Sequence, residues 1–105
     1  MRPEDRCRAM FELDKARILE ADVFLFVLDG RVPDEGACVE LGIANCSKEL
    51  GGNNKLIIGL HTDPRAAFLG ARLNPMLHGG LDHVSEDTES LLNVLENYKQ
   101  GKIAL

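Results

Sequence analysis

The run from Val23 to Leu28 is the sequence feature that most constrains how this chain can fold. All of its side chains are apolar, whereas a strand with one face in water alternates apolar and polar residues. Such a run is typical of a central strand in a parallel sheet, where helices cover both faces. It is also far shorter than the roughly 20 residues that a membrane-spanning helix needs. The run therefore predicts a buried parallel strand and no membrane span.

Helical and strand patterns alternate along the rest of the chain. Apolar residues at helical spacing predict helices over 4–20, 36–50 and 86–98, and a second apolar run predicts a strand at 55–60. Prolines and glycines predict loops from 61 to 83, with one helical turn at 64–69 and a turn at Gly79-Gly80. We therefore expect an α/β fold in one domain spanning 1–105, with a three-layer flavodoxin/Rossmann-like parallel sheet flanked by helices.

The composition excludes several classes of partner and cofactor. The chain has 12 Lys and Arg against 17 Asp and Glu, for a net charge of −5. This balance argues against nucleic acid or an anionic membrane as the main partner, because both bind clustered basic residues. The start of the chain does not lead into a signal-peptide pattern, and three cysteines fit reduced thiols, so we expect a cytoplasmic protein. The histidine and cysteine spacings predict no metal site.

An acidic loop follows the first strand. It spans 29–36 and contains Asp29, Asp34 and Glu35, and Glu40 follows in the next predicted helix. In open α/β sheets, ligands bind beyond the carboxyl ends of the strands, where this loop would lie. A carboxylate near a helix N-terminus is held ionised by the helix dipole, as a carboxylate nucleophile must be. Glu40 is therefore a candidate nucleophile.

A purely structural interpretation of the same acids stays open. Asp34 can be the N-cap of the helix, and Glu35 and Glu40 can be ordinary helix-favouring acids. Two details favour a site. Gly42 costs a helix about 1 kcal/mol, which suggests that something packs close to the backbone there. Asp14, on the preceding helix, would lie near the same sheet edge if that helix runs antiparallel to the strand.

Segment 21–44 resembles the signature of the nucleoside 2-deoxyribosyltransferases. In that family a buried strand precedes an acidic loop ending in Asp-x-Gly, here 34–36, and a helix with Glu-Leu-Gly-x-Ala, here 40–44. The resemblance extends to Asp14 and to Asn74-Pro75-Met76. It implies transfer of a 2-deoxyribosyl group between nucleobases through a covalent glutamyl ester, with no metal or organic cofactor.

The resemblance also implies a role for each matching residue. Glu40 matches the nucleophile that attacks the anomeric carbon, and Asp14 matches the acid that protonates the leaving base. The small-molecule partners would be deoxynucleosides and nucleobases, bound in a homo-oligomer whose active sites are shared between subunits. Asn74 and Met76 match residues that reach in from the neighbouring subunit. The residues expected to bind substrate are Asp34, Asp29, Gly30, Gly36, Asn74 and Met76.

Two alternatives to the transferase remain open. The family's members begin with a strand and a glycine-containing turn, and nothing before Pro3 matches them. The chain is therefore expected to be an N-terminally truncated domain, a natural short variant completed by oligomerisation, or a domain that keeps the motif without the activity. A hydrolase that cleaves 2′-deoxynucleoside 5′-monophosphates resembles the chain in the Glu-Leu-Gly segment. A non-catalytic nucleotide-binding or oligomerisation module that lacks the first strand is the other alternative. A sheet edge left open in this way should pair with another copy.

Overall fold

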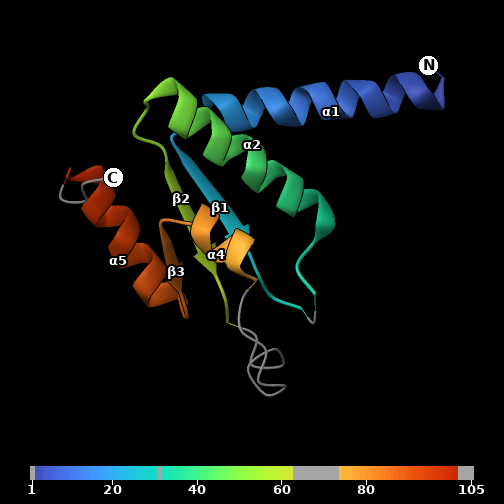
Figure 1. The fold of residues 1–105 in the computed structure, drawn as a ribbon. Coiled ribbons are helices and arrows are strands. Elements are labelled where there is room, and N and C mark those ends of the chain that lie inside the picture. Colours follow the sequence, from blue (N-terminus) through green and yellow to red (C-terminus); the bar gives the residue numbers. More distant parts are fainter. Residues whose placement is uncertain (1, 31, 63–73, 102–105) are drawn as a thin grey trace.

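A parallel sheet with helices on both faces forms the body of the protein (Figure 1). The computed structural model describes residues 2–30, 32–62 and 74–101. The α/β class and the parallel sheet predicted from the sequence are therefore confirmed. In chain order the elements are α1 (Pro3–Glu20), β1 (Val23–Val27), α2 (Glu35–Gly51), β2 (Leu56–Leu60), α4 (Pro75–Gly80), β3 (His83–Ser85) and α5 (Thr88–Lys99).

The described sheet has three parallel strands in the order β1-β2-β3. β2 is the central strand and is buried along most of its length, whereas β1 lies at the edge. The prediction that β1 is the central strand is wrong for this part of the chain. Phe24 and Phe26 are buried, but Leu25 and Val27 are exposed. This alternation arises because α2 covers one face of β1, while α5 packs on β2 and β3.

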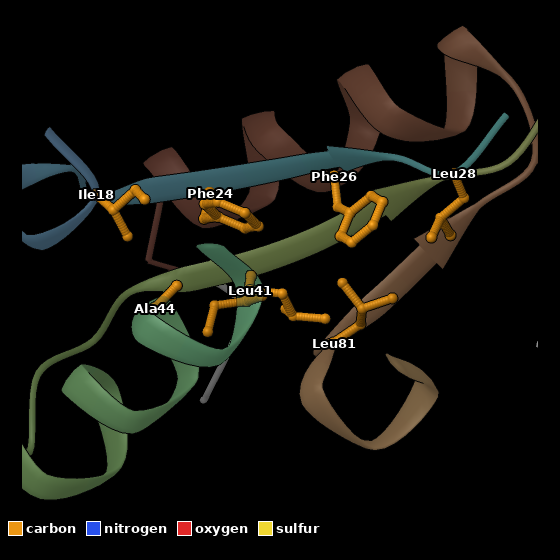
Figure 2. Close-up of a cluster of buried hydrophobic side chains, with 8 residues drawn as sticks. Ile18, Phe24, Phe26, Leu28, Leu41, Ala44 and Leu81 are labelled. Carbon is orange, nitrogen blue, oxygen red and sulfur yellow. The ribbon is translucent and has the colours of Figure 1, made fainter. Parts of the chain in front are cut away.

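The larger core lies between the sheet and α2. Phe24, Phe26 and Leu28 extend from β1 and the residue that follows it toward Leu41 and Ala44 of α2 (Figure 2). The list of buried members is completed by Ile18 of α1, Ile57 of β2 and Leu81, which precedes β3. This cluster holds α2 against the strands, so the start of α2 is fixed close to the carboxyl end of β1.

The opposite face of the sheet packs against α5. Leu56 and Ile58 of β2 contact Leu91, with Val94 and Leu95 packed around them. Asp87 caps α5, because its side chain accepts a hydrogen bond from Ser90 N at 2.7 Å. The helical periodicity of the predicted terminal helix is therefore confirmed, with observed bounds shifted by one or two residues.

The segment predicted to be loop contains two regular elements. α4 and β3 fall at 75–80 and 83–85, so the loop prediction is wrong there, and Gly79-Gly80 ends a helix rather than forming an isolated turn. Asn74 caps α4 and Pro75 occupies its first turn. β3 is positioned by tertiary contacts, since Asp82 N donates to Ile57 O of β2. The helical turn predicted at 64–69 lies outside the described residues.

Helix α1 differs from the other helices in its packing. Only Ile18 is buried and only Lys15 is half-buried, because the helix projects away from the sheet (Figure 1). Its end is held by Lys55, a 3% exposed side chain whose Nζ donates to the carbonyl oxygens of Ile18, at 2.8 Å, and Ala21. No helix in the described ranges is long and apolar enough to cross a membrane.

Candidate active site

The carboxyl ends of β1 and β2 are joined through Asp29. Its Oδ1 accepts a hydrogen bond from Thr62 N at 2.7 Å, and its Oδ2 accepts one from the Thr62 hydroxyl. Gly30 follows with φ of +114°, a conformation that residues with a Cβ rarely adopt, so the chain turns sharply there. Asp29 and Gly30 thus fix where the loop leaves the sheet.

The residues that start α2 act structurally. Asp34 is the N-cap, and its Oδ2 accepts a hydrogen bond from Ala37 N at 2.9 Å. A Cβ on Gly36 would lie 3.3 Å from the same oxygen, so a side chain there would crowd the cap. The N-cap alternative for Asp34 is confirmed. A role for Asp34 or Gly36 in substrate binding stays a prediction.

Glu40 lies in the second turn of α2 and is half-buried. The helix begins at Glu35, so Glu40 lies beyond the first turn, where the helix dipole acts most strongly. The dipole argument for an ionised Glu40 is therefore weaker than the sequence suggests. Among the described residues, the Glu40 carboxylate has no hydrogen-bond or ion-pair partner. Its position is set by the packing of α2, and no cation of 2–30, 32–62 or 74–101 is paired with it.

Asp14 lies on α1 and Glu40 lies on α2, each about one helical turn before a residue of the main core cluster. Ile18 and Ala44 share one buried cluster (Figure 2), and each acid lies four residues before one of them. Because residues four apart share a helix face, both acids lie on the core-facing sides of α1 and α2. Asp14 is exposed, and α1 and α2 diverge toward their N-termini (Figure 1). The two acids therefore belong to helices that pack against each other, and no hydrogen bond joins their carboxylates within the described residues.

Asn74 and Met76 lie at the start of α4. Asn74 Oδ1 accepts a hydrogen bond from Met76 N at 2.8 Å, and Met76 is 83% exposed. On α2, the side chain of Asn45 donates a hydrogen bond to Gly80 O of α4 at 3.3 Å. The side of α2 that carries Asn45 therefore faces α4, and we call it the α4 side. Glu40 lies about 140° around the helix from Asn45. Glu40 therefore does not share the face of α2 that Gly80 of α4 contacts.

Gly42 does not contact a packed backbone. A Cβ built there meets no atom of the described residues within 4 Å, so the expected close approach is not found in that part of the chain. Gly42 instead lies on an apolar groove of about 690 Å³ between α1 and α2. We name this surface the α1/α2 groove; its lining residues include Lys15, Leu19, Val39, Ile43, Cys46 and Leu50.

Sequence reasoning missed a polar cluster on the α4 side of α2. Lys48 Nζ forms an ion pair with Asp82 at 2.8 Å, and Asp82 Oδ2 also accepts a hydrogen bond from Ile57 N. Lys48 and Asp82 are far apart in the chain, and neither belongs to a motif that would have indicated the pair. The cluster fixes the entry to β3 and makes no contact with Glu40.

The described residues offer no set of ligands for a metal ion. No group of three or more His, Cys, Asp or Glu side chains comes together within 2–30, 32–62 and 74–101. Cys7, Cys38 and Cys46 are free thiols.

Two comparisons with known proteins found no match. No family model matches the chain, and no curated protein sequence matches it. The structure by itself defines an α/β protein with a parallel sheet and acidic residues beyond the carboxyl end of its edge strand. The function must be inferred from these residues.

Proposed function

We propose that the chain transfers 2-deoxyribosyl groups between nucleobases, as in the nucleoside 2-deoxyribosyltransferases that segment 21–44 resembles. The observation that carries the proposal is the position of Glu40, half-buried in the second turn of α2, the helix that follows the acidic loop after β1. Within the described residues no cation neutralises it, and Asp14 lies on α1, the helix that packs against α2. The layered parallel sheet is compatible with the flavodoxin-like architecture that this function implies.

The residue types suit a double displacement. The Glu40 carboxylate would attack C1′ of a 2′-deoxynucleoside, forming a C1′–O bond as the C1′–N bond breaks. Asp14 would donate its proton to the departing base. A second base would then attack C1′ and release Glu40, and Asp14 would take up the proton that the new base loses. Atoms and charge balance without a metal or an organic cofactor.

The supporting residues would hold the substrate around this pair. Asp29 and Gly30 set the path of the loop, and the cap formed by Asp34 sets the start of α2. Asn74 and Met76 would complete the site from a second subunit, because within one chain they lie on the α4 side of α2. Free thiols at all three described cysteines fit the reducing cytoplasm, where nucleosides are salvaged.

The test is the intact mass of the protein after incubation with a 2′-deoxynucleoside. The wild type should gain one deoxyribosyl group, and base exchange should appear when a second nucleobase is added. Glu40→Gln should gain none and lose exchange by roughly 10³-fold or more. Glu49→Gln, on an exposed acid of the same helix, is the matched control and should behave as wild type.

A second variant separates the acid from the nucleophile. Asp14→Asn should slow exchange by about 10²-fold or more, but it should react normally with a deoxyriboside whose leaving group needs no proton. Free deoxyribose 5-phosphate from a monophosphate, with no exchange, would indicate the hydrolase. Nucleotide binding without an adduct or product would indicate the non-catalytic module and contradict the proposal.

A further inference from the structure

Lys55, directly before β2, is a buried lysine without a carboxylate partner. Its side chain is 3% exposed, and no acid within 2–30, 32–62 and 74–101 forms an ion pair with it. Burying an ammonium group is unfavourable unless other oxygen atoms replace its water. The Lys55 ammonium group donates instead to the backbone carbonyl oxygens of Ile18, at 2.8 Å, and Ala21. The buried charge therefore acts at one place, the end of α1.

Both acceptors of the Lys55 ammonium group belong to the C-terminal end of a helix. The last carbonyl groups of a helix have no partner inside it, and they carry its partial negative charge. Ile18 lies in the last turn of α1, and Ala21 is the C-cap. An ammonium group that bonds both carbonyls supplies the missing donors and a charge of opposite sign. Because both oxygens bind one nitrogen atom, Lys55 fixes the place where α1 ends.

The backbone around Lys55 is itself fixed to the sheet. Asn53 Oδ1 accepts a hydrogen bond from Lys55 N at 3.1 Å. The next residue, Leu56, begins β2 and donates its N–H to Asp22 O, between α1 and β1, at 2.9 Å. The ammonium group therefore joins the end of α1 to the amino end of the central strand.

Few other contacts within the described residues hold α1 on the body. Ile18 is the only buried residue of this helix, and residues 3–14 are all exposed. Leu19 lines the α1/α2 groove but is 47% exposed. The direction in which α1 projects from the sheet (Figure 1) therefore depends mainly on Ile18 and on the hydrogen bonds from Lys55.

We propose that Lys55 is a positioning residue for Asp14, the acid of the proposed reaction. Asp14 lies one turn before Ile18 on α1. By holding the end of α1, Lys55 sets where the Asp14 carboxylate lies relative to Glu40. Lys55 acts through the helix, because its ammonium group donates to backbone oxygens of α1 and its cap and not to either acid. This inference rests on the proposed function.

A small tilt of α1 is enough to disturb proton donation. Asp14 lies four residues from Ile18, or about 6 Å along the helix axis. A tilt of about 10° at the anchor would therefore move Asp14 by roughly 1 Å, and a misplacement of that size can cost about 10²-fold in rate. Glu40 should stay in place, because Leu41 and Ala44 hold α2 in the core. Loss of Lys55 should therefore impair the acid and spare the nucleophile.

The test compares two substrates in the wild type and in Lys55→Met. One is a 2′-deoxynucleoside, whose base must be protonated as it leaves, and the other is a 2-deoxyriboside whose leaving group needs no proton. Lys55→Met should lower kcat for base exchange from the first by about 10-fold or more. It should form the covalent adduct from the second within about twofold of the wild-type rate. Lys99→Met, on the exposed surface of α5, is the control and should change neither rate.

A milder pair of variants tests the same coupling with little risk to folding. Ile18→Val removes one methyl group from the buried end of α1, and Ile57→Val removes one from β2 in the same cluster. Ile18→Val should lower the ratio of exchange to adduct formation by about threefold or more. Ile57→Val should leave this ratio unchanged, because it does not loosen α1. Equal ratios in the two variants would contradict the dependence of Asp14 on the anchor.

The outcomes separate this inference from the proposed function. If Lys55→Met lowers both rates by the same factor, or lowers neither, the positioning role of Lys55 is overturned and the transferase stands. A wild type that forms no adduct and exchanges no base would instead overturn the proposed function, and this inference with it.

Hydrogen exchange tests the anchor without any substrate. The backbone amides of residues 15–20 should exchange by local opening, because few contacts hold α1. In Lys55→Met they should exchange about 10-fold faster than in the wild type, whereas Ile57→Val should leave their rates unchanged. Equal rates in Lys55→Met and the wild type would show that Lys55 does not fix the end of α1, and would overturn the inference.

Discussion

Asp29 accepts a hydrogen bond from the backbone N–H of Thr62 at 2.7 Å, and so joins the ends of two neighbouring strands. A second hydrogen bond from the Thr62 hydroxyl reaches the other oxygen of the same carboxylate. One acidic side chain therefore fixes both the exit of the loop that precedes α2 and the end of β2. Asp29, which the sequence predicted to bind substrate, therefore has a structural role at the carboxyl ends of β1 and β2.

Asp29→Ala should destabilise the protein by about 1–3 kcal/mol, because both hydrogen bonds from Thr62 lose their acceptor. Thr62→Val removes only the hydroxyl donor and should cost about 1 kcal/mol. Thr62→Ser keeps the hydroxyl and serves as the control, with a stability close to that of the wild type. Urea unfolding measures all three. Equal stabilities of Asp29→Ala and wild type would show that the link between the strands is energetically unimportant.

Lys55→Met should lower the free energy of unfolding by about 2–3 kcal/mol. The buried ammonium group donates to Ile18 O and Ala21 O, and its loss leaves both carbonyl oxygens without this donor at the end of α1. Lys99→Met, on the exposed surface of α5, should change the stability by less than about 0.5 kcal/mol. Chemical denaturation of the two variants side by side decides the question, and similar small effects would argue against a role for Lys55 in fixing α1.

Gly59→Ala and Gly42→Ala should have opposite effects on stability. A Cβ on Gly59 would lie 2.9 Å from Leu28 Cδ1 and 3.1 Å from Leu81 Cδ1, so we expect a loss of roughly 1–3 kcal/mol. A Cβ on Gly42 meets nothing within 4 Å, so alanine should stabilise α2 by about 0.5–1 kcal/mol. Urea unfolding of each variant beside the wild type measures both effects. Destabilisation by Gly42→Ala would reveal a close neighbour within the chain.

Tyr98 should make the stability depend on pH in alkaline solution. Burial raises the pKa of Tyr98 above its ordinary value of 10.0, and the negative charges of Asp22 and Asp82 add to the shift. Because the folded pKa is higher than the unfolded one, the contribution is complete below pH 10.0 and is lost as the pH rises through the folded pKa. The hydroxyl also donates to Asn54 O at 2.6 Å.

Tyr98→Phe should therefore cost about 1 kcal/mol at pH 7 and should remove this alkaline loss of stability. The chain has a single tyrosine, so the ultraviolet absorbance of phenolate reports this group alone. In the folded wild type, ionisation should occur above pH 10.0 and should return to the ordinary value in urea. A folded midpoint at or below the unfolded one would contradict the prediction.

The helices and the two longer strands were predictable because their signals are local. Apolar periodicity located α1, α2 and α5 within a few residues, and the apolar runs located β1 and β2. Asn74 and Pro75 form an N-cap and first-turn pattern that could have predicted the start of α4. The two glycines at 79–80 favoured a turn instead. β3 has three residues with two exposed side chains, so it carries no periodic signal.

For the candidate site, the sequence placed Asp29 and Asp34 correctly beyond the end of β1, because strand-to-loop order follows directly from the chain. It placed Glu40 near the start of α2, and the structure puts this residue in the second turn, because the helix begins at Glu35. It did not indicate that Asp14 would be exposed, because that depends on the direction in which α1 leaves the body. The Lys48–Asp82 pair also could not be read from the chain, because it joins residues that only folding brings together.

The sequence by itself determined the class of the fold, the positions of its main helices and strands, and the acidic loop after β1. These follow from side-chain periodicity, capping residues and turn residues, which act over a few positions of the chain. The tertiary structure decided that β1 lies at the edge of the described sheet, that β3 pairs with β2, and that α1 projects from the body. Those outcomes depend on which surfaces are buried together, and that balance is set by contacts between distant segments.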